Sequence, residues 1–203
     1  LGLAYRSKGD LDRALASLEQ AVRLDPGAAV AVSSRGATYG MKGDVDRAIA
    51  DLDQSVKLNP DDPRVFHNRA IAWRNKGDLD RAVADFDQAI KLDPKYATAL
   101  YNRGNVFFVK KDYEHAIADY DQAIKLNPGY AAAYNSRGLA YAERRESDRA
   151  LADFRPSIKP TPTDPPVSNN RGFTYRRQGD SARATPHTHR PRRPTFRAVT
   201  GYP

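Results

Sequence analysis

The chain has 203 residues, no cysteine and a formal net charge of +8. The lack of cysteine excludes disulfide bonds and thiol catalysis, and no apolar run is long enough to span a bilayer. All of the excess positive charge falls in residues 155–203, because acidic and basic residues balance in residues 1–154. The balanced region gives no general reason to expect nucleic-acid binding.

A period of 34 residues runs through most of the chain. Prolines recur at this spacing, and aromatic residues, alanines and glycines keep the same register, with Ala70 in one of the glycine positions. The members of the four sets are Pro26, Pro60, Pro94, Pro128 and Pro162; Tyr5, Tyr39, Trp73, Phe107, Tyr141 and Tyr175; Ala14, Ala48, Ala82, Ala116, Ala150 and Ala184; and Gly2, Gly36, Gly104, Gly138 and Gly172. Such a fixed period indicates a stacked repeat protein rather than a single globular core.

In chain order, the register gives a partial repeat in residues 1–28 and full repeats in residues 29–62, 63–96 and 97–130. The first repeat lacks the opening of its first helix. We therefore interpret the chain as a fragment that a signal peptide or further repeats could precede.

The third repeat shows most clearly which elements a repeat contains. Pro63 follows two aspartates, as at the start of a helix, and a glycine–aspartate pair ends that helix and can cap the next one. Pro94 then prevents continuation. We predict helices over residues 64–76 and 79–92. The apolar residues of the second helix form one helical stripe: Leu79, Ala82, Val83, Phe86, Ala89 and Ile90. Each repeat is therefore predicted to be an antiparallel helix pair, and the fold class to be all-α.

The register fails late in the fifth repeat, residues 131–164. Pro156 would lie inside a helix, so we expect that helix to end near Arg155. A linker rich in proline and threonine follows, and residues 165–184 keep only a degenerate half repeat. Residues 185–203 are basic and rich in proline and arginine, so we expect them to be disordered. A reading-frame change is one hypothesis for this ending.

The repeat resembles the tetratricopeptide repeat (TPR). The shared features are a small residue such as Gly36, an aromatic residue three positions later, the alanine at Ala48, a bulky residue at Leu52 and the proline that ends the repeat. The resemblance covers residues 1–155 and, more weakly, residues 165–184. It implies a right-handed α-solenoid of stacked helix–turn–helix repeats, similar to bacterial scaffold proteins and to the superhelix of the protein O-linked N-acetylglucosamine transferase.

One departure from the family pattern is an arginine just before the small residue. It recurs with an aspartate in the same register, and the members are Arg35, Arg69, Arg103, Arg137 and Arg171, and Asp51, Asp85, Asp119 and Asp153. Two interpretations stay open. The residues form a ladder of ion pairs between repeats, or the arginines form a cationic row in the groove that binds acidic partners.

The sequence holds no P-loop, nucleophile elbow, His-x-x-x-His pair or dinucleotide-binding glycine pattern. Asp51 and Asp53 stand two residues apart, so on a helix they point in different directions, and such pairs recur as structural groups do. His187 and His189 form only a weak metal-binding pattern without an evident third ligand. We predict no catalytic residue, no cofactor and no metal.

The resemblance implies where a partner binds. In this family the first helix of each repeat lines the concave face, which holds extended peptides or partner helices. The positions of this sequence that match the groove are Arg64, His67, Asn68, Ile71, Arg74, Asn75, Tyr101, Asn102, Asn105, Phe108, Asn135 and Leu139.

Asn68 and Asn102 match the asparagine ladder with which the glycosyltransferase superhelix holds peptide backbones. An amide donates and accepts hydrogen bonds at once, so it suits a peptide unit of any sequence. Ser34 and Ser136 interrupt the ladder, and Asn170 resumes it. The alternative is that these asparagines merely satisfy helix surfaces.

The carboxylate clamp of chaperone-binding members is not reproduced, because Ser33, His67 and Tyr101 occupy its places. We therefore predict a non-catalytic protein-interaction scaffold that binds a protein segment or an extended peptide in its groove. The alternative is a substrate-presenting accessory region of a larger enzyme or envelope-assembly protein. A weaker option is nucleic-acid binding through the basic tail. The compartment, cytoplasmic or periplasmic, and the oligomeric state stay open.

Overall fold

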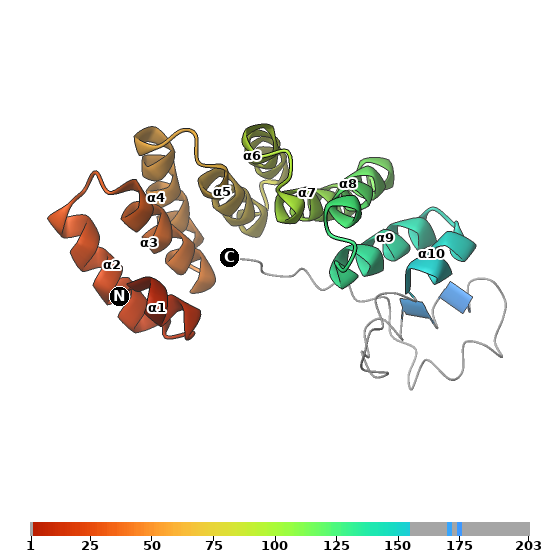
Figure 1. The fold of residues 1–203 in the computed structure, drawn as a ribbon, viewed down its shortest axis with the longest axis horizontal. Coiled ribbons are helices and arrows are strands. Elements are labelled where there is room, and N and C mark those ends of the chain that lie inside the picture. The colour runs from red at the N-terminus through yellow and green to blue at the C-terminus, as the bar shows by residue number, and fades with distance from the viewer. Residues whose placement is uncertain (1, 155–169, 172–173, 176–203) are drawn as a thin grey trace. The chain divides into compact units, whose positions relative to one another are not determined.

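The computed structural model describes residues 2–154, 170–171 and 174–175, and these residues contain helices and no strand. The prediction of an all-α fold is confirmed. The helices are α1 (Gly2–Ser7), α2 (Leu11–Leu24), α3 (Ala29–Met41), α4 (Val45–Leu58), α5 (Pro63–Lys76), α6 (Leu79–Leu92), α7 (Ala97–Val109), α8 (Tyr113–Leu126), α9 (Ala131–Glu143) and α10 (Ser147–Phe154). The chain divides into two parts between Ala99 and Leu100, and each part is described by itself (Figure 1).

The two helices predicted for the third repeat are confirmed as α5 and α6. The Asp62 side chain caps α5 by accepting a hydrogen bond of 2.9 Å from the Arg64 backbone N–H, and Pro63 follows at the first helical position. Asp78 caps α6 by accepting from the Arg81 N–H at 3.0 Å. Gly77 turns the chain between them with a φ of 91°, in the left-handed region that glycine adopts without strain.

In the N-terminal part, α1 to α6 pack in chain order, each on the next (Figure 1). One apolar cluster joins α2, α3, α4 and α5. Its buried members are Leu15, Tyr39, Ala48, Ile49, Leu52, Val65 and Ala72. A single helix pair cannot cover its own apolar stripe, so successive repeats share one core.

The small residues of the register lie where the two helices of a repeat cross. A Cβ atom added to Gly36 would stand 3.0 Å from Leu52 Cγ and 3.1 Å from the Ala48 carbonyl oxygen. Ala48 itself is fully buried. The predicted close approach of the helix backbones is therefore present in the second repeat.

In the C-terminal part, α8 packs on α9 and α9 on α10. The residues of α7 from Leu100 onward contact α8: a Cβ on Gly104 would lie 2.7 Å from Tyr120 Cε1. Gly138 approaches Phe154 in the same way, at 2.6 Å from Cε1. The last described residue of α10 is Phe154.

Several predictions fall outside the described residues. They are the break at Pro156, the linker, the disordered tail with its two histidines, and most of the half repeat in residues 165–184. None of the described helices combines the length and the apolar character needed to cross a membrane. The described residues also contain no cluster of three or more potential metal ligands.

Candidate functional site

The arginines of the register form two-pronged ion pairs with the aspartates. Arg35 Nε and Nη2 donate to the two carboxylate oxygens of Asp51, both at 2.7 Å. The other described pairs repeat this geometry: Arg69 with Asp85, Arg103 with Asp119 and Arg137 with Asp153. Arginine and aspartate belong to the same repeat, so the bond joins its two helices. We call each of these pairs a clamp.

Arg69 and Arg137 also bind an aspartate of the preceding repeat. Arg69 Nη1 donates to Asp53 at 2.7 Å, and Arg137 Nη1 donates to Asp121 at 2.5 Å. The predicted ion pairs between repeats are thus present at these two bonds. The two-pronged pairs of the recurring arginines and aspartates, however, lie within single repeats. Hydrogen bonds from the arginines to the aspartates raise the pKa of Arg69 and Arg137 above the ordinary value, so both stay charged.

Six of the predicted groove residues lie on α5, in the N-terminal part. Arg64 has an exposed side chain, at 69%, and its guanidinium binds both oxygens of Asp62 at 2.8 and 2.9 Å. Arg74 is half-buried and donates to the Asn75 side-chain oxygen at 3.4 Å, while Asn75 is exposed. Arg64 and Asn75 are therefore the members of this set most open to a partner.

The remaining three α5 positions are buried. Ile71 is fully covered and Asn68 nearly so. The His67 ring lies against two aromatic rings, with its centroid 5.7 Å from that of Phe86 and 5.0 Å from that of Tyr96. Burial lowers the pKa of His67 to about 4, so the ring is neutral at pH 7. A groove role for these three residues stays a prediction.

In the C-terminal part, the predicted residues of α7 form a polar interior. Tyr120 donates a hydrogen bond of 2.8 Å to the buried Asn105 side-chain oxygen. Tyr101 lies with its ring 4.9 Å from that of Tyr130, and its hydroxyl is 3.5 Å from Ser136 Oγ on α9. These contacts bring α7, α8 and α9 together.

The other four C-terminal positions differ in exposure. Asn102 is buried, and Phe108 is half-buried with its ring 5.4 Å from that of Tyr113. Asn135 accepts a hydrogen bond of 3.2 Å from Asn170, which is a position of the asparagine ladder. Leu139 packs in an apolar cluster with Phe154.

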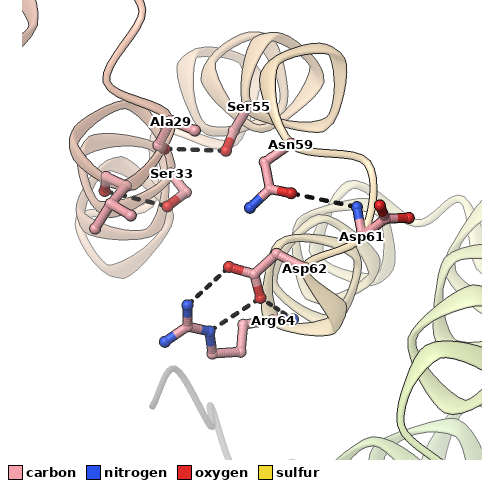
Figure 2. Close-up of polar contacts among 8 residues, drawn as sticks. Ala29, Ser33, Ser55, Asn59, Asp61, Asp62 and Arg64 are labelled. Atoms are coloured by element: carbon pink, nitrogen blue, oxygen red, sulfur yellow. Dashed lines mark hydrogen bonds and ion pairs between the residues drawn. The ribbon is translucent and has the colours of Figure 1, made fainter.

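An open pocket of about 520 Å³ lies at the start of α5. It is lined by Asn59, Asp61, Asp62, Pro63, Arg64, Asp93 and Tyr96. Figure 2 shows the wall formed before and at the start of α5, where the Asp62–Arg64 pair and the Asn59–Asp61 contact lie side by side. Three carboxylates and one guanidinium give the pocket an acidic balance.

Of the residues that line this pocket, only Arg64 was predicted as a site residue from the sequence. Tyr96 lines the pocket and its ring lies 5.0 Å from that of His67, and burial raises the tyrosine pKa to about 12. Tyr96 stands just before a first helix, where Ala28 and Asp62 stand in the earlier repeats. Comparing the repeats at this position, outside the family motif, could have found it.

A second recurring contact was also missed. The aromatic residue of a first helix lies under an arginine eight positions later in several repeats: the Arg81 guanidinium carbon is 3.7 Å from the Trp73 ring centroid, and that of Arg47 is 4.4 Å from Tyr39. In the fourth repeat His115 takes this place, 5.2 Å from Phe107. The arginine contacts are cation–π contacts that join the two helices of a repeat.

This architecture of helix pairs stacked in chain order defines a helical-repeat protein. The family model for the tetratricopeptide repeat matches residues 1–63, 67–131 and 112–165. The chain belongs to the tetratricopeptide repeat family, as the sequence resemblance predicted. A comparison with curated proteins finds no match.

Solved structures with this fold include proteins of several kinds. MamA of Desulfovibrio magneticus RS-1, from residue 41 to its end, is 26% identical, with a TM-score of 0.73 over 78% of this chain and 90% of that one. PilW, a type IV pilus biogenesis factor, is 19% identical, with a TM-score of 0.84 over 92% and 86%. YrrB, a TPR protein with an unusual peptide-binding site, is 18% identical, with a TM-score of 0.70 over 84% and 88%.

Proposed function

We propose that the chain is a non-catalytic scaffold that binds a segment of another protein, an extended peptide or a partner helix, along the first helices of its repeats. Stacked helix pairs provide such a surface because each first helix adds a further set of side chains to one face. YrrB, a protein of the same fold, has a peptide-binding site, which is in line with the proposal.

The observation that carries the proposal is the open pocket at the start of α5. It joins a predicted groove residue, Arg64, to the carboxylates of Asp61 and Asp93 and the phenol of Tyr96. Its volume of about 520 Å³ accommodates a long side chain with part of its backbone. Because carboxylates outnumber cations in its lining, the pocket favours a segment that presents lysine or arginine.

The test is a peptide array probed with the full chain and with Asp93→Asn. Asparagine stands at the matching position in the second and fourth repeats, Asn59 and Asn127, so the substitution removes one charge and keeps the local structure. We expect basic peptides that bind the wild-type chain to bind this variant several-fold more weakly.

The matched control is Asp25→Asn, which makes the same change at the matching position two repeats earlier, outside the pocket. Peptide binding by this variant should equal that of the wild type. Equal binding by all three proteins, or a set of bound peptides without basic residues, would count against the proposal.

A further inference from the structure

The start of α5 carries charges that the matching positions of other repeats do not have. Asp61, Asp62 and Arg64 line the pocket described above. The second and fifth repeats hold only uncharged residues at these positions: Gly27, Ala28 and Val30, and Gly129, Tyr130 and Ala132. The helices α3 and α9 begin there without a side-chain cap. A first helix of this fold therefore forms without these charges, so helix formation alone does not account for them.

The charges of the pocket divide into a bound pair and two further carboxylates. Asp62 accepts from the Arg64 backbone N–H and, with both oxygens, from the Arg64 guanidinium. The Asp62 side chain is only 11% exposed, so its charge is balanced within the chain. Asp61 and Asp93 form no ion pair with a described residue. These two carboxylates therefore remain for a cation of the ligand.

Arg64 keeps hydrogen-bond donors that Asp62 does not use. Its Nε and Nη2 bind Asp62 (Figure 2), whereas Nη1 makes no hydrogen bond to a described residue. A guanidinium has five N–H donors, so one edge of the Arg64 guanidinium is still open. Because the side chain is 69% exposed, this edge can reach a group that arrives from outside the chain.

Two other arginines show what such an edge binds in this protein. Arg69 holds Asp85 with Nε and Nη2, and with Nη1 it holds a second carboxylate, that of Asp53, at 2.7 Å. Arg137 repeats this arrangement. Both arginine side chains are 18% exposed, and their second carboxylate comes from the chain itself. Arg64 has the first carboxylate of this arrangement and not the second.

We propose that the second carboxylate for Arg64 comes from the bound segment, which carries an acidic residue close to the lysine or arginine that Asp61 and Asp93 receive. This inference rests on the proposed function and narrows it from basic segments to segments of mixed charge. A segment with basic residues alone would satisfy the two carboxylates, but Arg64 would repel it. A segment in which opposite charges are neighbours is complementary to the whole pocket.

The probe is the tightest-binding basic peptide of the array described above, labelled with a dye. Each residue within four positions of its lysine or arginine is replaced in turn by glutamate and, in a paired peptide, by glutamine. Fluorescence anisotropy with the full chain gives the affinity ratio of each pair. At one or more positions we expect the glutamate peptide to bind about three- to fivefold more tightly, as a pair of exposed charges allows.

Arg64→Thr tests whether Arg64 is the cation that the glutamate meets. It copies Thr98, the residue at this position in the fourth repeat. The affinity ratio should fall to one or below, because the substitution also leaves the charge of Asp62 unbalanced. In Asp93→Asn both peptides should bind more weakly while their ratio is kept, since this carboxylate meets the basic residue. Such a double-mutant cycle separates the two contacts.

Arg81→Thr is the matched control. Arg81 binds the aspartate that caps its own helix, Asp78, and its side chain is 59% exposed, but it does not line the pocket. This variant should keep the wild-type ratio. If Arg64→Thr folds poorly by circular dichroism, Arg64→Lys replaces it. Lysine keeps the charge and lacks the second edge, so the ratio should again fall toward one.

Three results would overturn the proposal. The first is equal affinity of the glutamate and glutamine peptides at every position, which would leave the proposed function intact. The second is a preference for glutamate that persists in the Arg64 variant, because the glutamate would then meet another group. The third is that no basic peptide binds the chain, which would overturn the proposed function as well.

Discussion

At the scale of single residues, the clamps tie the two helices of a repeat through an arginine and an aspartate 16 positions later. The first repeat has neither group, because Leu1 and Ser17 stand at the two positions. The charges are thus absent together. That is expected of two groups whose main role is to neutralise each other, and it favours the structural interpretation of the arginines over a cationic row for acidic partners.

Arg35→Leu should lower the free energy of unfolding by about 2–4 kcal/mol, because it leaves the mostly buried Asp51 carboxylate without its clamp. Adding Asp51→Ser copies the first repeat and should restore at least about 1 kcal/mol. Urea titrations followed by circular dichroism measure both values. If the double variant instead lost the sum of the two single losses of unfolding free energy, Arg35 and Asp51 would not stabilise the chain through each other.

His67 makes stability depend on pH. Its pKa is about 4 in the folded chain because of burial, against about 6.5 when unfolded, so the unfolded chain binds the extra proton first as the pH falls. The stabilisation is complete above pH 6.5 and is lost between pH 6.5 and 4, by about 3 kcal/mol in all.

Urea midpoints measured from pH 4 to 8 check this prediction. His67→Tyr, which copies the residue at the same position in the fourth repeat, Tyr101, provides the control and should show a flatter profile. Identical profiles for the two chains would show that other groups cause the pH dependence.

At the scale of elements, the turn between the helices of a repeat has one backbone geometry and two kinds of residue. Gly9, Gly43 and Gly77 adopt a positive φ with open space around the missing Cβ, so conformation and not crowding requires glycine there. Lys111 and Arg145 hold the same positive φ in the fourth and fifth repeats, at 63° and 66°. A residue with a side chain is strained in this region.

Lys111→Gly should therefore raise the free energy of unfolding by about 0.5–1 kcal/mol, the relief of strain exceeding the greater entropy of glycine in the unfolded chain. Lys110→Gly, one position earlier, is the control. It should lower stability slightly, because the φ of Lys110 is not positive and only the entropy of the unfolded chain changes. Thermal unfolding compares the stability of the two variants. A loss of stability in both of them would contradict the presence of backbone strain at Lys111.

Helix crossing gives a second element-scale prediction. Gly104→Ala should destabilise the chain by about 1–3 kcal/mol, because its Cβ would stand 2.7 Å from the ring of Tyr120, which is fully buried. Gly129→Ala adds the same atom at a position whose nearest neighbour is 3.5 Å away, and it should be nearly neutral. Chemical denaturation distinguishes the two variants, and equal effects would show that the crossing can relax.

The helices of this chain could be predicted from the sequence better than the candidate site could. The proline and aspartate signals placed α5 and α6 to within a residue, because caps and breakers act locally. The burial of His67 and Ile71 could not be predicted from such local signals. It depends on side chains such as Tyr96 that arrive from other elements, and the polar residues of a first helix do not show which of its faces is covered.

At the scale of the whole molecule, each helix of the N-terminal part contacts mainly its neighbours in the chain. Stability in such a stack is nearly a sum of repeat and interface contributions, so the ends should open before the middle. In hydrogen exchange followed by mass spectrometry, we expect α1 to exchange fastest and α4 slowest within this part. Uniform protection from α1 to α5 would instead mean that the part unfolds as one cooperative unit.

The clamps have a consequence for how a gene of this kind can change length. Both charges of a clamp are encoded within a single 34-residue module, as for Arg69 and Asp85. Unequal recombination at a module boundary would add or remove cation and anion in equal number, and it would strand neither of them in the interior. An array built in this way can be extended or shortened by whole modules while its electrostatic neutrality is inherited with each copy.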